Sequence, residues 1–572
     1  AEVTDAEISQ AVAEQERLIA DLIEQLGHPK AILREQAEKE LRQIGPAALD
    51  ALTRAMEHAD IEIVMRAKYL LGTISVDWVV PGDSEPVKDL MKDYPKKQEE
   101  ARREVLKQLA AVDDHNAVEA LCRIVRFEES YRLSKEAALA IIAMPWPAGE
   151  QAEARMAVIR DSLGRNTRLS SKWLRTFLAS HDNPEAALAQ WADHIEQESL
   201  ALRQSPRLTD RGIVRDLLMY YIALLETAEQ PEAAQAAMTR LIDLETGEQE
   251  SVLKLVEWLM EKKAWSVIDS VHEKFSEAFD QSPLLLYTLA QAKLEQGKTE
   301  QAEEAAARAL QFNPGMAPEH LIMAYNLQDR GLFQWAEQEY RKSIEIGPPT
   351  GEIAVRGGFL LSEMLHDLQR EKEAAEQLEQ IVEGMKDPNV MRILQRIGRD
   401  PGSIVSRMQY FWACHWRDNN DLAKSWEALD KAVAADASDA DVLIAMHRAP
   451  ELDEKQRQRV SKLIEQAAAT FEHQIKLQPN IETAYNQYAW LIGNTEGDYE
   501  KALKYSLRSL ELRPNEGGYL DTLGRCYFAL ERYDDAIKTQ RRAVNQEPHS
   551  GAIRRQLEFF EAEVARIEAA TP

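Results

Sequence analysis

The sequence is poor in cysteine, and its histidines are scattered. Its 572 residues include three cysteines and twelve histidines, with no CxxC pair and no spacing typical of zinc ligands. The sequence therefore predicts neither a disulfide framework nor a metal site. We expect Cys122, Cys414 and Cys526 to serve as small hydrophobic residues of the core.

The sequence also lacks the short motifs that accompany common catalytic sites. It contains no glycine-rich phosphate loop, no GxSxG elbow and no HExxH helix. Cys414 and His415 are adjacent, but neighbouring residues on a helix point about 100° apart and do not form an obvious nucleophile–base pair. We therefore expect a protein that is not an enzyme, with no catalytic residue and no cofactor.

Long apolar runs and an excess of basic charge are missing as well. The most apolar stretch, residues 217–225, is far shorter than the ~20 residues of a membrane-spanning helix and indicates a buried helix instead. Lys and Arg number 69 against 97 Asp and Glu, which gives a net charge of -28. Because this charge repels phosphate backbones and anionic lipid headgroups, we do not expect a nucleic-acid partner. The shortness of the apolar run predicts that there is no transmembrane segment.

The chain starts with the residues AEVTDAE rather than with methionine. This start fits the mature end that a signal peptidase leaves after cutting behind small residues, and it also fits a trimmed chain. The low cysteine content agrees with either a periplasm or a cytoplasm. Between these compartments we favour the periplasmic or exported location.

What the sequence does contain is one unit written twice within residues 283–350. Three pairs of residues recur 34 positions apart: Gly297 and Gly331, Ala302 and Ala336, Pro314 and Pro348. A small residue lets two helices cross closely, glycine permits a tight turn, and proline cannot continue a helix. The pattern resembles the tetratricopeptide repeat, a helix–turn–helix unit of 34 residues. This resemblance implies an all-α fold, an α-solenoid of helix–turn–helix repeats.

The same period extends backward from this pair of units. Counting back from Gly297 in steps of the repeat reaches Lys263 and then Glu229. We therefore expect both residues to lie in turns between helices. The register predicts four regular tetratricopeptide repeats over residues 213–350.

Beyond residue 350 the array becomes irregular and then regular again. We expect irregular repeats over 351–480, including an insertion at 390–405 with a short helix and an unusually long helix at 451–477. Alanine and proline again recur 34 apart in two C-terminal repeats, 481–550. A final helix, 551–572, is expected to cap the array by covering its last apolar face.

A different helical pattern occupies the N-terminal part. Leu33, Ala37, Leu41 and Ile44 make an apolar stripe that ends at a Gly-Pro pair. This pattern resembles HEAT repeats, and the segment REQAEKELRQIGPAAL is similar to HEAT modules of planctomycete proteins, which implies a bacterial source. We divide this part into HEAT-like repeats, a proline-containing loop, further HEAT-like helices and a transitional helical repeat: 1–75, 76–95, 96–147 and 148–212.

Candidate binding residues follow from the concave face, on which tetratricopeptide solenoids usually bind. For the last two repeats this face is predicted to include Tyr485, Asn486, Trp490, Tyr519, Arg525 and Phe528. Asn and Arg can hydrogen-bond an extended peptide or a chain terminus. The family's carboxylate clamp for chaperone tails uses a Gly-Asn pair, whereas this chain has Gly524-Arg525, so the clamp is not reproduced.

Two further groups of residues have alternative interpretations. Arg203, Arg207 and Arg211 recur every four positions and, if helical, make one cationic stripe. Such a stripe is either a solvated face or a docking surface for an acidic partner. The aromatic cluster Tyr410, Phe411, Trp412 and Trp416 either packs between neighbouring repeats or lines an apolar pocket beside the 390–405 insertion.

These observations favour a non-catalytic scaffold or adaptor that helps to assemble or stabilise a multiprotein complex. Its partners are expected to be other protein subunits or peptide segments. The alternative is a regulatory peptide-binding module that recognises extended segments or chain termini on the concave face. In both cases we expect specificity to lie where the repeats are interrupted, because the regular residues explain only the fold.

Overall fold

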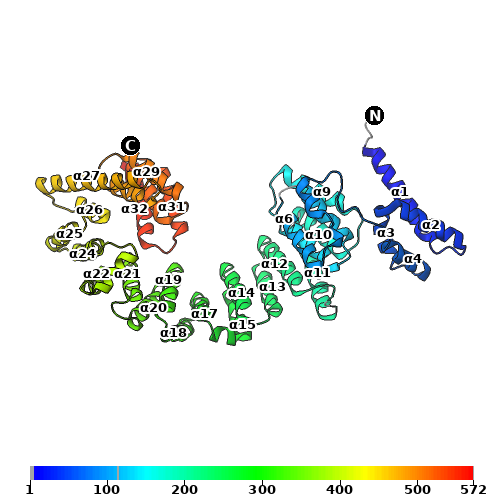
Figure 1. Ribbon diagram of the computed structural model, residues 1–572, viewed down its shortest axis with the longest axis horizontal. Helices are drawn as coiled ribbons and strands as arrows, with labels where there is room; N and C mark the ends of the chain where they lie inside the picture. The colour runs from blue at the N-terminus through cyan, green and yellow to red at the C-terminus, as the bar shows by residue number, and fades with distance from the viewer. Residues whose placement is uncertain (1–4, 113–114, 206, 571–572) are drawn as a thin grey trace. The chain divides into compact units, whose positions relative to one another are not determined.

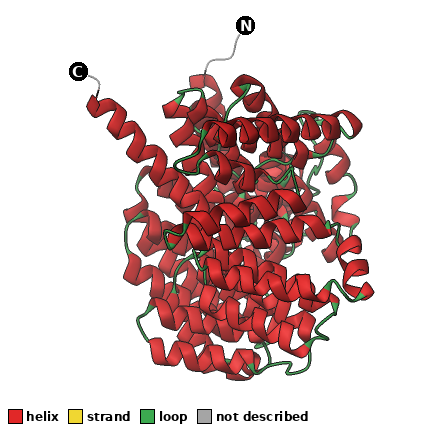
Figure 2. Ribbon diagram, turned by 90° about the vertical axis from the view of Figure 1, so that its left-hand side faces the viewer, coloured by secondary structure: helices red, strands yellow, loops and turns green. Residues whose placement is uncertain are grey.

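The computed structural model describes residues 5–112, 115–205 and 207–570, and within them every regular element is a helix (Figures 1 and 2). Consecutive helices form antiparallel pairs that stack on one another. The fold is therefore an all-α solenoid, as the sequence predicts. It divides into two compact units, residues 1–278 and 279–572, which are described separately.

The first unit contains the helices up to α16, and their bounds are as follows. They are α1 (Asp5–Gln25), α2 (Ala31–Ile44), η1 (Gly45–Ala48), α3 (Leu49–Ala55), α4 (Ile61–Leu71), α5 (Glu85–Met91), η2 (Tyr94–Lys96), α6 (Glu99–Ala110), α7 (His115–Phe127), α8 (Tyr131–Ala143), α9 (Glu150–Leu163), α10 (Leu169–Asp182), α11 (Pro184–Gln204), α12 (Arg211–Thr227), α13 (Pro231–Leu241), η3 (Ile242–Leu244), α14 (Gln249–Glu261), α15 (Trp265–Lys274) and α16 (Ser276–Asp280), whose end reaches into the second unit.

Helices α1 to α4 enclose a core of their own, with Leu26, Leu41, Leu52 and Ala67 fully buried. The stretch 76–95, expected to be a proline-containing loop, holds the short helix α5. Its Ser84-Glu85-Pro86 start places proline in the first turn, where the missing N–H is not needed. A helix therefore replaces part of the expected loop.

The second unit contains the remaining helices. They are α17 (Pro283–Glu295), α18 (Thr299–Leu310), α19 (Ala317–Asp329), α20 (Phe333–Ile346), α21 (Glu352–Asp367), α22 (Glu371–Gly384), α23 (Pro388–Arg396), α24 (Pro401–Asp418), α25 (Leu422–Ala435), α26 (Ala440–His447), α27 (Glu454–Leu477), α28 (Glu482–Asn494), α29 (Tyr499–Leu512), α30 (Gly517–Ala529), α31 (Tyr533–Gln546) and α32 (Gly551–Ala570). The short helix expected in the insertion is α23, and the expected long helix is α27, with 24 residues.

The turn inside the regular repeats has one backbone geometry. The φ angle is 73° at Gly297 and 75° at Gly331, and it is also left-handed at Glu229 (55°) and Lys263 (53°). In each turn the next N–H donates to a carbonyl five residues earlier, as in Lys298 to Lys293 at 2.9 Å. This is the Schellman ending of a helix. The prediction that Glu229 and Lys263 lie in turns is confirmed.

Within the second unit, the start of the last helix binds the end of a much earlier one. The carboxylate of Asp367, the last residue of α21, accepts hydrogen bonds from the backbone N–H groups of Gly551 (2.8 Å) and Ala552 (2.6 Å). The Arg555 guanidinium donates to the Asp367 carbonyl at 3.0 Å. We call these contacts the latch. Next to them, the His549 ring packs so closely on Gly331 that no side chain fits there.

The latch joins residues that are 184 or more positions apart in the sequence. Helices α21 to α32 therefore form a closed turn of the solenoid rather than an open arc. Asp367 supplies the acceptors that the first N–H groups of α32 need, and its negative charge suits the N-terminus of a helix.

We predict that Gly297→Ala lowers the free energy of unfolding by about 1 kcal/mol, because alanine is strained at left-handed φ. Nothing lies within 4 Å of the added Cβ, so the backbone strain is the whole cost. Gly315→Ala is the matched control, since that site is equally open but is not left-handed. Chemical denaturation measures both variants, and an equal loss in the two would contradict this account of the turn.

We also predict that Asp367→Asn weakens the latch by about 1 kcal/mol, the typical value of a helix cap. Hydrogen exchange at the first turn of α32 should become faster, while exchange in α28 stays unchanged. Asp329→Asn is the control, because Asp329 ends α19 as Asp367 ends α21 but is exposed and has no hydrogen-bond partner among the described residues. Unchanged exchange at α32 in the Asp367 variant would show that the latch does not hold that helix.

Candidate binding cavity beside α26

The most irregular first helix of the second unit is α26. The first helices α17, α19, α28 and α30 have 13 residues each, whereas α26 has 8. It ends at His447, shortly before Pro450, because the residue preceding a proline disfavours helical conformation. Five missing residues shorten the helix by about 7 Å.

A cavity of about 570 Å³ lies at this shortened end. We call it the α26 cavity. It is lined from five helices, α24, α25, α26, α27 and α28, and from the segment that follows α26. Its principal lining residues are Tyr410, Arg417, Trp426, Ile444, Arg448 and Trp490. The cavity thus combines an apolar floor with two guanidinium groups, and the acidic residues Asp441 and Glu451 also line it.

A chain of polar contacts fixes the aromatic wall of this cavity. The Trp490 indole N–H donates to Asp441 at 2.8 Å. Asp441 also accepts from Arg407 at 2.6 Å, and the same guanidinium binds Glu363 at 3.0 and 2.8 Å. Burial opposes ionisation of Asp441, but Arg407 and the Trp490 bond outweigh it and lower the Asp441 pKa. The contacts link α21, α24, α26 and α28.

Two arginines near the end of α28 have only neutral partners. Arg448 donates to the Asn494 amide oxygen, and the Arg525 Nε donates to the Gly493 carbonyl at 2.8 Å. Burial lowers the pKa of both guanidinium groups, that of Arg525 to about 10, and the charge of Arg448 contributes to this shift. Among the described residues no carboxylate forms an ion pair with either one.

The predicted concave residues of the last repeats do not form one open surface. Tyr485 is buried, donates to the Pro479 carbonyl at 3.1 Å and packs edge-on against Tyr505. Phe528 is stacked on Phe560 of α32, with ring centroids 4.5 Å apart. The neighbouring helices thus cover Tyr485, whereas Phe528 remains half-buried. Their role in partner binding stays untested.

The other four predicted residues are half-buried. Trp490, on α28, lines the α26 cavity. Arg525 belongs to α30, and its Nε donates to the Gly493 carbonyl near the end of α28. Asn486 has a buried side-chain oxygen without a hydrogen-bond partner, and burial raises the pKa of Tyr519. The structure therefore brings Trp490 and Arg525 to the cavity region, and their role as binding residues stays a prediction.

Sequence reasoning missed Arg448 and Arg417 as neighbours of Trp490. A signal was present in Ala449-Pro450, which ends α26 early and makes room for the cavity. The predicted place of the pocket was also wrong, because the α26 cavity lies beside the shortened helix and not at the 390–405 insertion.

The aromatic cluster divides between packing and the cavity. Phe411 is fully buried and stacks on His366, with centroids 4.6 Å apart. The Trp412 indole donates to Glu379 at 2.9 Å, and its ring stacks on Trp416. Tyr410 instead lines the α26 cavity. Packing therefore accounts for Phe411, Trp412 and Trp416, whereas Tyr410 lines a cavity that does not lie beside the 390–405 insertion.

The predicted cationic stripe of the first unit does not exist as one helical face. Helix α11 ends at Gln204 and α12 begins at Arg211, so Arg203 and Arg211 lie on different helices and Arg207 lies between them. The backbone leaves the helix at Ser205, in front of a proline. All three arginines are exposed.

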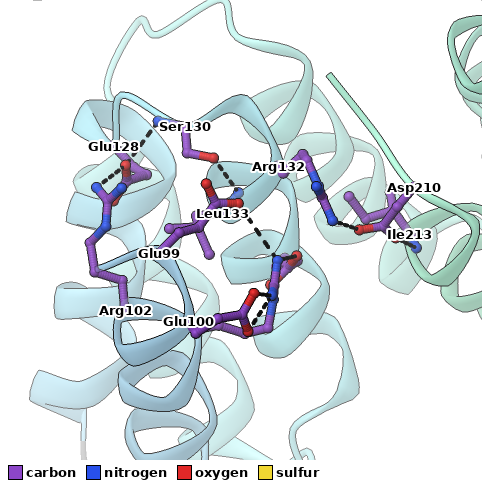
Figure 3. Close-up of polar contacts among 11 residues, drawn as sticks. Glu99, Glu100, Arg102, Glu128, Ser130, Arg132, Leu133, Asp210 and Ile213 are labelled. Atoms are coloured by element: carbon purple, nitrogen blue, oxygen red, sulfur yellow. Dashed lines mark hydrogen bonds and ion pairs between the residues drawn. The ribbon is translucent and has the colours of Figure 1, made fainter. Parts of the chain in front are cut away.

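Other charged residues of this unit bind one another (Figure 3). Arg132 on α8 donates at 2.6 Å to Asp210, which also caps α12 by accepting from the Ile213 N–H at 3.0 Å. Arg102 on α6 binds the buried Glu128 at 2.6 Å. These ion pairs connect α6 with the end of α7, and α8 with the start of α12.

Chemical sites of other kinds were also sought in the described part of the chain. No group of three or more His, Cys, Asp or Glu residues there has the geometry to hold a metal ion. None of the helices within the described ranges is long and apolar enough to cross a membrane. The three cysteines are free and buried, which confirms the expectation that they belong to the core.

Comparison with known proteins identifies the repeats. A family model of the tetratricopeptide repeat matches residues 284–315 and 518–550. The chain therefore contains tetratricopeptide repeats, which in general build protein-interaction surfaces rather than catalytic sites. No curated protein sequence matches the chain at a significant level.

Several solved structures are similar to parts of the chain. A thermophilic tetratricopeptide protein of Thermus thermophilus is 18% identical, covers 36% of this chain and 99% of its own, and has a TM-score of 0.24. The TPR2AB domain of yeast Sti1, in complex with pHSP90, is 14% identical, with coverages of 44% and 98% and a TM-score of 0.18. A monomeric mutant of IFIT1 with Gppp-AAAA is 15% identical, with coverages of 84% and 92% and a TM-score of 0.30. At these TM-scores the likenesses add nothing to what the helix pairs show.

We predict that Trp412→Ala lowers the free energy of unfolding by about 2 kcal/mol, because it removes a half-buried indole, its stacking on Trp416 and its bond to Glu379. The control is Tyr325→Ala, whose aromatic side chain is 59% exposed on α19. Thermal unfolding compares the two variants. An unchanged melting temperature together with lost partner affinity would show that Trp412 binds a partner instead.

Proposed function

We propose that this chain is a non-catalytic interaction scaffold or adaptor that helps to assemble or stabilise a multiprotein complex. An adaptor needs at least two separate surfaces, and each unit offers one. The second unit has the α26 cavity, with its apolar floor and guanidinium groups. The first unit has an exposed apolar stripe on α4.

The α4 stripe consists of Ile61, Met65 and Tyr69, which are 71%, 59% and 54% exposed. Their spacing of four places them on one face of the helix, while Ile63, Ala67 and Leu70 fill the core on the other face. Ile32 of α2 is 72% exposed as well. Contiguous apolar side chains in water are unfavourable and commonly mark contacts with other proteins. The stripe therefore supports a role in binding another subunit.

The α26 cavity favours a second candidate function, a regulatory module that binds extended peptide segments or chain termini. Its volume lies in the range that holds a ligand or a side chain, and Trp426, Ile444 and Trp490 supply apolar contact. Interface energy usually concentrates in a few such buried anchors. The two functions differ in the partner, which is a stable subunit for the scaffold and a weakly held peptide for the module.

The proposal includes the assignment of the N-terminal part. We infer that residues 1–75 and 96–147 are HEAT-like repeats, related to those of planctomycete proteins. The separate core of α1 to α4 supports a repeat type that packs differently from the tetratricopeptide pairs. The remaining boundaries, including 148–212 and 351–480, are part of the same inference.

We predict that charges placed in the two surfaces remove different partners. Met65→Glu should abolish contact with the protein bound at α4, and Leu422→Glu should do the same for the segment bound at the α26 cavity, which Leu422 lines. Both side chains are exposed, so stability should change by less than about 0.5 kcal/mol. Affinity purification and mass spectrometry compare these variants with the unaltered chain.

Tyr325→Glu is the control, since it places the same charge at an exposed aromatic residue outside both surfaces. The adaptor role is supported if each surface variant loses its own partner and retains the other. An identical set of bound proteins for all three variants would contradict it.

A further inference from the structure

The two arginines near the end of α28 lack acidic partners in a chain that is rich in carboxylates. Acidic residues outnumber basic ones, with 97 against 69. Arg330 also has neutral partners, but other guanidinium groups of the second unit bind carboxylates. Arg407 binds Glu363 and Asp441, and Arg370 binds Glu337 and Glu373. Arg448 and Arg525 instead bind an amide and a carbonyl. Their positive charges are not compensated by a carboxylate.

The location of both groups has a partial explanation in the helix itself. Arg448 and Arg525 approach Asn494 and Gly493 from different helices, at the C-terminal end of α28. This end carries partial negative charge and attracts cations. One helix end nevertheless compensates only about half an elementary charge, whereas two guanidinium groups are present.

Both guanidinium groups also retain free donors. An arginine has five N–H groups, and each of these two uses one nitrogen in the bonds described. Their other nitrogens have no partner among the described residues, yet none of them is sealed from solvent. They are therefore accessible to an anionic group, for which a pair of guanidinium groups is the strongest common receptor.

The apolar part of the site lies directly beside these donors. Arg448 lines the α26 cavity together with Trp490, Trp426 and Ile444. Trp490 belongs to α28, the helix whose end carries both guanidinium contacts, and its indole is held by Asp441. A ligand that reaches Arg448 therefore also reaches an apolar floor.

We propose that Arg448 and Arg525 bind the carboxylate of an acidic side chain in a partner segment, whose neighbouring bulky apolar side chain fills the α26 cavity. This rests on the proposed function and names the chemistry of the partner. The positive charge of the two arginines favours an acidic side chain in the partner, and the apolar floor of the cavity favours a bulky apolar side chain next to it. Arg448 is exposed, whereas Arg525 is half-buried beside α28, so that a side chain extending from a passing backbone reaches Arg525 better than the backbone itself does.

The test uses the full chain and fluorescein-labelled peptides with blocked ends. The probe is acetyl-Gly-Ser-Trp-Glu-Gly-Ser-amide. One comparison peptide has Gln in place of Glu, and another has Ser in place of Trp. A fourth peptide ends in a free carboxylate after Trp and contains no Glu. Fluorescence anisotropy gives the dissociation constants, at low and at high salt.

We expect the Glu peptide to bind at least tenfold more tightly than the Gln and Ser peptides, with an advantage that shrinks at high salt. Arg448→Gln and Arg525→Gln should each weaken the binding of the Glu peptide about tenfold. Arg330→Gln is the matched control, because Arg330 is also half-buried with neutral partners, Gln291 and Thr288, but does not line the cavity. The Arg330 variant should bind the Glu peptide with unchanged affinity. Circular dichroism verifies that each variant is folded.

Equal binding of the Glu and Gln peptides, or equal losses in the three arginine variants, would overturn the proposal. Tighter binding of the peptide with the free carboxylate would overturn the choice of a side chain and indicate a chain terminus. Failure here is distinguishable from failure of the adaptor role. If Leu422→Glu loses its partner while Arg448→Gln retains it, the adaptor role holds and the acidic recognition is wrong.

Discussion

The repeats of this chain depend on a close crossing of two helices, at which only a small side chain fits. Fully buried alanines occupy the crossing in five second helices: Ala302, Ala336, Ala375, Ala502 and Ala536. A larger side chain would separate the helices and disturb the packing on both sides. A left-handed turn precedes four of these crossings, all but the one at Ala502, and fixes the angle between the two helices. Each pair then presents the same apolar face to the next pair, and the solenoid grows by repetition.

Departures from this geometry create the surfaces with chemical character. Helix α26 is short, and its missing turns leave the α26 cavity. The long helix α27 follows it, so that this repeat is unlike its neighbours in both helices. Regular repeats use their polar residues on one another, as Tyr287 does with Glu339, whereas Arg448 at the irregular site has no acidic partner. The fold therefore provides a rigid frame, and binding chemistry lies where one repeat is incomplete.

Much of the fold could be predicted because a repeat is a local pattern. The period placed Glu229 and Lys263 in turns, which prove to be left-handed although neither residue is glycine, and the interruptions of the period located α23 and α27. Features that depend on contacts between distant repeats could not be predicted. The latch between Asp367 and α32 has no sequence period, and the burial of Phe528 depends on how α32 folds back over α30. For the binding site, periodicity identified Trp490 and Arg525 but not Arg448, because the cavity arises from a shortened helix.

The central claim is that the irregular repeat, and not the regular ones, binds the partner. Hydrogen exchange of the full chain, measured alone and with a co-purified partner, tests it most directly. The account predicts slower exchange in α26, in the segment 448–453 and in the last turn of α28, with little change over residues 283–346. Protection confined to the regular repeats, with none around α26, would contradict it.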